Sequence, residues 1–267
     1  MICVLGDAHV DVVVRLDEPF AEETDTRAVT SVGVGGQAAN VAAWVCALGG
    51  RARLIAAQAG DLAGRLVAAE LAGRGVELVG PVLDGRTGVV VSLSERGTAR
   101  SMLTDRGVGP QLEAGALQAS WLDDCTWLHL PAYSLVADPV AGAAIAAAAL
   151  APRLSVDLSS TAALRGYGIA RFRALLAQLR PAVVLGNEAE AAMLGDLPGR
   201  DLPDCEFVVK LGPSGVRAGG RVHPAAATQP VDSTGAGDAF AAGYLLGGIS
   251  LGLHAAARAV ARMGAMP

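Results

Sequence analysis

The sequence has few aromatic residues, and it lacks the cysteine and histidine patterns that mark metal and redox sites. Phe, Tyr and Trp make up 4% of its 267 residues although 52% are hydrophobic, so we expect a core built from Ala, Val and Leu. The four cysteines are far apart, none forms a C-x-x-C pair, and no H-E-x-x-H occurs. Neither a zinc site nor a disulfide framework is indicated, which favours buried cysteines in a reducing compartment.

An excess of positive charge and a long apolar run are absent as well. The formal net charge is −5 and the pI is near 5.4, which argues against a surface made for nucleic acid or anionic lipid. The most apolar run, Val140 to Ala151, is too short to cross a bilayer, and residues 1–11 lack the basic start of a signal peptide. We expect a cytoplasmic protein that binds neither nucleic acid nor membrane.

Short apolar runs recur along the chain and predict the strands of a sheet. Their hydrophobicity is continuous rather than alternating, which favours burial on both faces and hence a mainly parallel sheet covered by helices. The runs are "MICVLG", "ARLIAAQ", "VELVG", "CTWLHL", "RLSVDL", "AVVLG" and "EFVVKL". Helical spacing lies between most of them, at Leu62 to Arg74, Pro110 to Trp121, Ala137 to Leu150 and Gly168 to Leu179. The pattern predicts a doubly wound α/β domain.

Two segments, Val10 to Gly33 and Thr87 to Thr104, break this rhythm. The first holds a strand-like run and then an acidic, turn-rich stretch, and the second holds two alternating runs around a turn near Glu95 to Gly97. Alternation leaves one face in water, so we expect a small antiparallel sheet that projects from the main one and closes over a ligand. No repeat, linker or clean boundary divides the chain, which predicts one domain over residues 1–267.

Two glycine-rich loops are candidates for nucleotide binding. The first has the G-x-G-x-x-[GA] pattern of dinucleotide-binding proteins at Gly33, Gly35 and Ala38, ahead of a helix. An NAD-dependent oxidoreductase is thus one hypothesis, although the loop does not follow the first strand and no acidic residue closes the next one. Alternatively, Gly35 and Gly36 let the backbone approach a ligand and the Asn40 amide binds a polyol, or Asn40 merely satisfies nearby backbone.

The second loop lies in "VDSTGAGDAFAAGY", from Val231 to Tyr244. It is not a Walker A motif, because no G-x-x-x-x-G-K-[ST] occurs in the chain. Small residues from Ser233 to Gly237 offer backbone N–H groups at the positive end of a helix, but Asp238 follows in the first turn and would repel a phosphate. Either Asp238 complements the helix dipole, worth about 0.3–1 kcal/mol, or it is a base beside a phosphoryl group.

Two shorter motifs have competing interpretations. Asn187 and Glu190 share one face at the start of a helix after a buried strand, where they form a capping-box pattern or act as partners for Mg²⁺ with phosphates. Gly212 and Gly215 lie in a loop after the strand "EFVVKL". A flat base would fit against this backbone, although the loop alone is only a turn.

Together these stretches resemble the ribokinase-like (PfkB) family of sugar and nucleoside kinases. The matches occur in the family's order and span nearly the whole chain. They are "GGQAANVA" (35–42), "NEAE" (187–190), "VKLGPSG" (209–215) and "DSTGAGDAFAAG" (232–243). The last is highly specific. The resemblance implies a Rossmann-like, three-layer α/β/α core with a small β lid.

The resemblance also implies a role for each matched residue. Asp238 matches the catalytic base, and the backbone of Gly235, Ala236 and Gly237 matches the anion hole. The residues implied to bind ATP are Asn187, Lys210, Gly212, Gly215, Thr234, Gly235 and Gly237. Those implied to bind the substrate are Asp11, Gly35, Gly36, Asn40 and Arg106, the last as a contact for an acidic or hydroxylated substrate or, alternatively, as a surface salt bridge. Asn187 and Glu190 would govern Mg²⁺ through water.

The expected activity is transfer of the γ-phosphoryl group of ATP to a hydroxyl of a small sugar or sugar acid. The scarcity of aromatic residues favours this acceptor over a nucleoside, and a nucleoside kinase of the same family is the alternative. A non-catalytic sugar sensor is a rival of another class, disfavoured because Asp238 and its glycines are intact. ATP and Mg²⁺ are the expected cofactors, a monovalent cation is left open, and a homodimer through the lid is an expectation.

Overall fold

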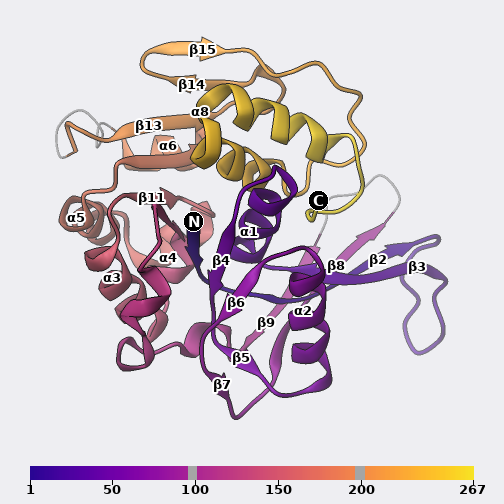
Figure 1. Cartoon of the computed structure of the whole chain (residues 1–267). Coiled ribbons are helices and arrows are strands. Elements are labelled where there is room, and N and C mark those ends of the chain that lie inside the picture. The colour runs from indigo at the N-terminus through magenta and orange to yellow at the C-terminus, as the bar shows by residue number, and fades with distance from the viewer. Residues whose placement is uncertain (96–100, 196–201) are drawn as a thin grey trace.

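The computed structural model describes residues 1–95, 101–195 and 202–267. Its centre is a nine-stranded sheet in the order β15-β14-β13-β12-β11-β10-β1-β4-β6 (Figure 1). Neighbouring strands from β6 to β13 are parallel, and β14 and β15 add an antiparallel edge. The strands are β1 (Ile2–Leu5), β4 (Ala52–Ile55), β6 (Glu77–Val79), β10 (Trp127–Pro131), β11 (Leu154–Asp157), β12 (Val183–Asn187), β13 (Glu206–Lys210), β14 (Val216–Ala218) and β15 (Arg221–His223).

Helices cover both faces of this sheet, and each face has its own hydrophobic core. In β1, Ile2 and Val4 belong to one core, whereas Cys3 and Leu5 belong to the other, which is why the run is apolar without alternation. On the first face lie α1 (Gln37–Ala47), α2 (Leu62–Gly73) and α8 (Ala236–Val260). On the second lie α3 (Val140–Leu150), α4 (Thr161–Tyr167), α5 (Ile169–Leu179) and α6 (Glu188–Leu194). The predicted three-layer architecture is confirmed.

A second, four-stranded sheet forms the lid, in the order β3-β2-β8-β9. Its strands are β2 (His9–Leu16), β3 (Ala28–Gly35), β8 (Thr87–Glu95) and β9 (Ser101–Gly107), and they lie in or next to the two predicted segments. The two outer pairs are antiparallel, while the central pair, β2 with β8, is parallel. Most of the predicted turn near residues 95–97 falls outside the described residues. A short parallel pair, β5 (Gln58–Ala59) with β7 (Val82–Leu83), completes the strands that the structure describes.

The helix predicted from Pro110 to Trp121 is wrong. This segment instead forms three single 3₁₀ turns, Gly109–Gln111, Ala114–Ala116 and Ala119–Leu122. Its apolar anchors, Leu112, Leu117 and Leu122, are five residues apart and pack into the second core. Since five residues advance an α-helix by about 500°, such a spacing does not return to one helical face. Separate turns bury all three side chains.

Polar residues collect at the carboxyl ends of the strands, which is where α/β sheets bind ligands. Asp157, Asn187 and Lys210 are the last residues of β11, β12 and β13, three neighbouring strands. α1 and α8 start above the same edge, and the lid lies beside it (Figure 1). The fold thus brings strand ends, two helix starts and the lid to one place.

Candidate active site

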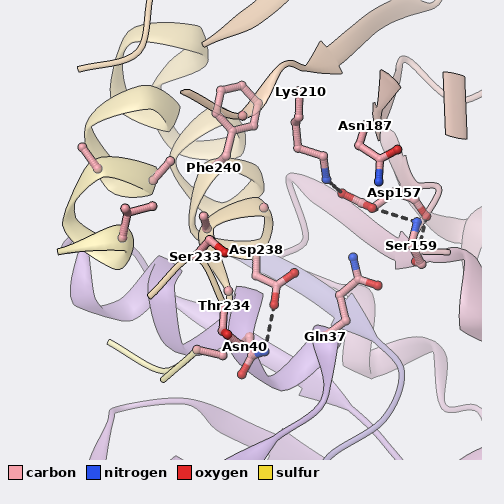
Figure 2. Close-up of a pocket in the computed structure, with 18 of the residues that line it drawn as sticks. Gln37, Asn40, Asp157, Ser159, Asn187, Lys210, Ser233, Thr234, Asp238 and Phe240 are labelled. Carbon is pink, nitrogen blue, oxygen red and sulfur yellow. Dashed lines mark hydrogen bonds and ion pairs between the residues drawn. The ribbon is translucent and has the colours of Figure 1, made fainter. Parts of the chain in front are cut away.

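A cavity of about 1210 Å³ opens between the sheet edge, the helix starts and the lid. Every predicted site residue except Gly35 lines it. The residues drawn from the two glycine loops and from the ends of β12 and β13 therefore meet, although the two loops are about 200 positions apart in the sequence. Figure 2 shows the part of this cavity between Asn40 and Lys210.

Asp238 and Asn40 meet across the cavity floor. The Nδ2 of Asn40 donates to Oδ2 of Asp238 at 2.8 Å, and Figure 2 shows the two side chains pointing toward each other. Burial raises the pKa of Asp238 to about 7, and the hydrogen bond from Asn40 opposes part of this rise in pKa. A carboxyl group with such a pKa can accept a proton near neutral pH. The interpretation in which Asn40 only satisfies local backbone is not supported.

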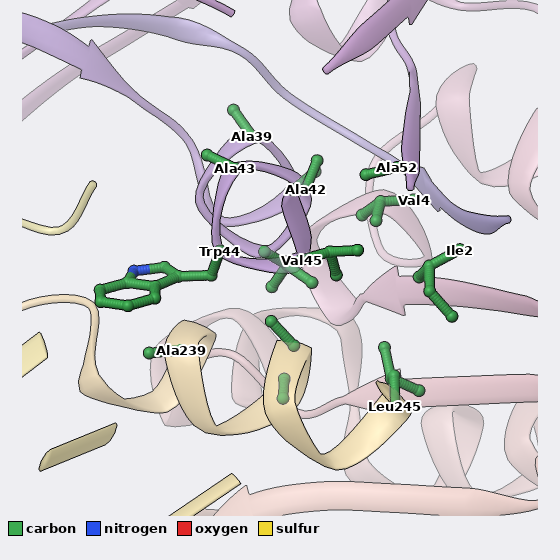
Figure 3. Close-up of a cluster of buried hydrophobic side chains, with 14 of the residues drawn as sticks. Ile2, Val4, Ala39, Ala42, Ala43, Trp44, Val45, Ala52, Ala239 and Leu245 are labelled. Carbon is green, nitrogen blue, oxygen red and sulfur yellow. The ribbon is translucent and has the colours of Figure 1, made fainter. Parts of the chain in front are cut away.

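The packing of α1 on α8 fixes this pair. Ala239 of α8 lies next to Trp44 of α1, and the two helices share one hydrophobic core (Figure 3). The indole Nε1 of Trp44 donates to the carbonyl of Ala265 at 2.8 Å. The chain after α8 is thereby held against the glycine loop.

The loop before Asp238 leaves backbone donors exposed to the cavity. Gly235 is the N-cap of α8 in a left-handed conformation, with φ +75°, and no side chain caps the helix. The Ala236 N–H donates to the carbonyl of Ser233 at 3.2 Å. The N–H groups of Gly235 and Gly237 have no partner among the described residues. These two amides are the free donors of the predicted anion hole.

Thr234 lines the cavity beside these glycines and is held by Asp232. Its N–H and its hydroxyl both donate to Oδ1 of Asp232, at 2.9 and 2.6 Å. The other carboxylate oxygen of Asp232 accepts from the N–H of Gly264 at 3.1 Å. Asp232 thus ties the loop to the end of the chain.

Asn187 and Glu190 form a complete capping box at the start of α6. Oδ1 of Asn187 accepts from the Glu190 N–H at 2.9 Å, and Oε2 of Glu190 accepts from the Asn187 N–H at 2.8 Å. Burial raises the pKa of Glu190, and the backbone hydrogen bond opposes this rise in pKa. Both residues also line the cavity, so capping and a role toward a ligand are compatible.

Lys210 makes a buried ion pair that its own motif does not reveal. Its Nζ lies 2.7 Å from Oδ2 of Asp157, whose side chain is 1% exposed. Burial alone would lower the pKa of Lys210, but the negative charge of Asp157 raises this pKa above its usual range. The turn that follows places Gly212 and Gly215 on the cavity wall.

Asp11 lies at the lid end of the cavity, 3.0 Å from Nε2 of His9. Gly35 faces it, and a Cβ on Gly35 would collide with the Asp11 carboxylate. Gly35 thus makes room for Asp11 rather than lining the cavity itself. Gly36 is the N-cap of α1 and has φ +104°. A Cβ on Gly36 would collide with the backbone carbonyl of Asp7.

Arg106 is in the cavity and not on the open surface, so the surface salt bridge is the weaker interpretation. Its Nε donates to Oδ2 of Asp7 at 2.7 Å, and Nη2 contacts the same oxygen. The guanidinium also lies 5.7 Å from the centre of the Tyr133 ring. Asp7 and Tyr133 were not predicted as site residues.

Two signals in the sequence point to residues that motif matching passed over. Asp157 ends the buried run "RLSVDL", and a charged residue at the carboxyl end of a buried strand is a candidate for a site. Its partner Lys210, which the motif match did include, is the single lysine among the 21 lysine and arginine residues of the chain. Asp7 lies two residues after the end of the first strand, Ile2–Leu5, and so close to the same edge of the sheet.

Comparison with known proteins shows the family to which the chain belongs. The model of the pfkB family carbohydrate kinases matches residues 1–266. An ATP-dependent ribose-1-phosphate kinase from Halopiger xanaduensis is 33% identical over an alignment of 261 residues, and this alignment covers 92% of this chain and 84% of that protein.

Two solved structures extend the comparison. The adenosine kinase from Sinorhizobium meliloti superposes with a TM-score of 0.84 at 26% identity. The superposition covers 100% of this chain and 95% of the adenosine kinase chain. A putative ribokinase II from E. coli in complex with ATP and Mg²⁺ has a TM-score of 0.83 at 21% identity and covers 99% of this chain and 94% of its own.

The oxidoreductase hypothesis fails on the same findings. Gly33 and Gly35 lie in lid strand β3, which is not part of the main sheet, whereas a dinucleotide loop follows a strand of that sheet. The match to the kinase family covers almost the whole chain. The protein belongs to the pfkB family of carbohydrate kinases and is an ATP-dependent kinase of that family.

Proposed function

We propose that this kinase transfers the γ-phosphoryl group of ATP to a hydroxyl of a small sugar, with Asp238 as the general base. The observation that carries the proposal is the first turn of α8, where the free amides of Gly235 and Gly237 adjoin a buried carboxyl group with a pKa of about 7. An anion hole and a base within one turn serve phosphoryl transfer.

Asp238 accepts the proton of the acceptor hydroxyl. The acceptor oxygen forms its bond to the γ-phosphorus while the bond from this phosphorus to the β–γ bridging oxygen breaks, and ADP leaves. Asn40 holds the Asp238 carboxylate in place through its 2.8 Å hydrogen bond. Because the transition state of such transfers is loose, alignment and charge stabilisation are the main tasks of the site.

The residues present fit ATP and Mg²⁺. The uncapped start of α8 suits phosphate oxygens, and a Cβ at Gly212 would meet nothing within 4 Å, so this turn leaves space on the cavity wall. The described residues contain no group of three or more His, Cys, Asp or Glu side chains able to hold a metal. Asn187 and Glu190 would therefore act on Mg²⁺ through water, and when bound the ion neutralises charge on the phosphates.

The acceptor end offers hydrogen-bond acceptors without partners. Buried oxygens of Asp7 (Oδ1), Gln37 (Oε1) and Asn40 (Oδ1) have no hydrogen-bond partner within the described parts of the chain. Sugar hydroxyls are the natural donors for such oxygens. Asp11 and the backbone at Gly36 lie on the same side, so we assign them to the sugar as well.

A sugar is favoured over a nucleoside. Besides His9, which is paired with Asp11, the aromatic side chains among the described residues that line the cavity are Tyr133 and Phe240. Arg106 covers Tyr133, and Phe240 stacks on Tyr244. Neither ring is set up to stack on a base beside the acceptor site. Arg106 would contact a hydroxyl or an acidic group of the sugar.

The deciding experiment is ADP release with a panel of acceptors. Ribose and ribose 1-phosphate come first, because a relative is named for the latter, followed by hexoses, keto-deoxy sugar acids, adenosine and pseudouridine. We expect turnover with a sugar or sugar derivative. Turnover with nucleosides alone would contradict the proposed acceptor, and binding of ATP without turnover on any member would contradict the proposed reaction.

The remaining expectations belong to the same proposal. We propose that residues 1–267 form one kinase domain. A cytoplasmic location and a monovalent cation beside the phosphates stay predictions. A homodimer through the lid is supported by the exposed apolar residues Val32 and Leu103 on its outer strands. Light scattering at increasing protein concentration tests the dimer, and a monomeric mass throughout would contradict it.

A further inference from the structure

The Lys210 side chain crosses the end of a neighbouring strand to reach its partner. β12 lies between β11 and β13, so the ion pair of Lys210 with Asp157 spans the terminal residue of β12. Asp157 is almost completely buried, and the Lys210 side chain is 18% exposed. Asp157 also accepts from the backbone N–H of Ser159 at 3.0 Å. The carboxylate is thus fixed from two sides and holds the ammonium group in one position.

That position is next to the anion hole. A Cβ placed on Gly237 would be 3.2 Å from Nζ of Lys210, and Gly237 supplies one of the two free amides. Of the three hydrogens on the ammonium group, the described residues accept one. Figure 2 shows Lys210 and Asp157 on one side of the cavity and Asp238 on the other. The remaining two N–H donors are available to an anion held by the amides.

We propose that Lys210 is a catalytic residue that binds the non-bridging oxygens of the phosphoryl group during transfer, and that Asp157 is the positioning residue that holds its ammonium group there. This inference rests on the proposed function. The ammonium group neither gives nor takes a proton in the step. It stabilises the charge on the phosphoryl oxygens while the bond to the bridging oxygen breaks and the bond to the acceptor oxygen forms.

The choice of residue agrees with this role. The chain uses arginine everywhere else, and Lys210 is its single lysine. An ammonium group is a compact point charge, whereas a guanidinium group is a wide planar fork. With Gly237 so close, the position accommodates the smaller cation. The Asp157 charge keeps the pKa of Lys210 high despite burial, so the group is charged at neutral pH.

Lys210 and Asp157 act on Asp238 in opposite directions. Besides burial, three groups influence the pKa of the Asp238 carboxyl, namely Asn40 from α1, Asp157 from β11 and Lys210 from β13. The negative charge of Asp157 raises the pKa of Asp238, and the positive charge of Lys210 lowers it. Removing each charge should therefore move the acid limb of the kcat/KM profile in opposite directions.

The kinetic test compares Lys210→Met and Asp157→Asn. We expect Lys210→Met to lower kcat about 10²- to 10³-fold with a much smaller change in the KM for ATP, and to shift the acid limb to higher pH. Asp157→Asn should lower kcat less and shift the limb to lower pH. The control is Asp124→Asn, which removes a carboxylate that pairs with Arg53 away from the cavity. This variant should change neither kcat nor the position of the acid limb. Shifts in the same direction, or an unchanged kcat in Lys210→Met, would overturn the proposal.

A second test needs no turnover. Because the chain has one lysine, protein labelled with ¹³C at lysine Cε gives one side-chain signal, that of Lys210. We expect β,γ-methylene-ATP with Mg²⁺ to move this signal more than ADP with Mg²⁺ does, since only the former has a terminal phosphate. Equal or absent shifts with both nucleotides bound, as measured by calorimetry, would contradict the role of Lys210. Failure of both to bind would instead contradict the proposed function.

Discussion

Two helices, α8 and α6, begin at the rim of the same cavity, but their first turns are built differently. At α8 the N-cap is Gly235, which has no side chain to give, and the amide of Gly237 is free. At α6 the N-cap is Asn187, which together with Glu190 closes a capping box. One helix start therefore keeps its backbone donors for a ligand, and the other uses them internally.

The difference explains why two similar acidic residues have different tasks. Among the described residues, the Asp238 side chain is bonded to Asn40 and not to its own helix start, so it remains available to a substrate proton. Oε2 of Glu190 accepts from the Asn187 N–H, so the other carboxylate oxygen is the one left to face a ligand. We infer that the chemistry takes place at α8, whereas α6 organises the surroundings of the phosphates.

The substitution Asp238→Asn tests this comparison of α8 with α6 most strongly. Loss of the base should lower kcat by about 10²- to 10⁴-fold, while ATP and sugar still bind, because the amide keeps the shape and an acceptor for Asn40. The measurement is kcat and KM with the acceptor found in the panel. Near-normal kcat would show that Asp238 is not the base.

The same variant has a thermodynamic signature. The pKa of Asp238 is raised to about 7 from 3.8, so the folded protein binds a proton that the unfolded chain has released between these values. The contribution of Asp238 to the free energy of unfolding is therefore largest below pH 3.8, and it declines as the pH rises toward 7. Asp238→Asn should raise Tm at pH 8 relative to wild type and have little effect near pH 4. In the wild type, kcat/KM should rise through pH 7.

The sequence predicts the frame of this site better than its contacts. Strands such as β1 and β12 are recognisable because parallel strands buried on both faces are continuously apolar, and Asp238 is recognisable because its neighbours are local in sequence. The hydrogen bond from Asn40 to Asp238 joins positions 198 residues apart, and only the packing of α1 on α8 brings them together. No local pattern encodes the ion pair of Lys210 with Asp157.

Errors in the predicted fold have a local physical cause too. Residues 110–121 contain enough apolar residues for a helix but at the wrong spacing. The hairpin of β14 and β15 was not predicted, because its strands are only three residues long. Gly219 and Gly220 between them form the kind of two-residue turn that joins hairpin strands. Short elements at an edge leave too little sequence to establish a period.

A smaller effect is expected when the α8 start is altered without touching Asp238. Gly235→Ala forces a Cβ into a left-handed residue, at 2.5 Å from the Cα of Ala265. The loop must move, which should misplace the anion hole and lower kcat by about 10²-fold, with a lower Tm as well. Kinetics and thermal melting of the purified variant measure both.

Gly248→Ala is the matched control for the backbone effect. Gly248 lies at the kink within α8, where its backbone is non-helical with φ +74°, and a Cβ there would meet nothing within 4 Å. It should cost about 1 kcal/mol of stability and leave kcat unchanged. If both variants lost activity in proportion to their loss of stability, the Gly235 effect would be one of folding and the free amides would not be needed.

The smallest effect is expected at α6, where the comparison predicts that capping and the Mg²⁺ requirement separate. Glu190→Gln keeps a side-chain oxygen that can accept from the Asn187 N–H, so the capping box survives and Tm should change little. The carboxylate charge is lost, and we expect the Mg²⁺ concentration for half-maximal rate to rise about tenfold. Glu188→Gln removes the same charge two positions earlier in the same turn of α6, from an exposed side chain near Arg217, and should leave the Mg²⁺ requirement unchanged. A large fall in Tm with wild-type Mg²⁺ dependence would leave capping as the sole role of Glu190, and equal Mg²⁺ shifts in both variants would reduce its effect to the general field of the helix start.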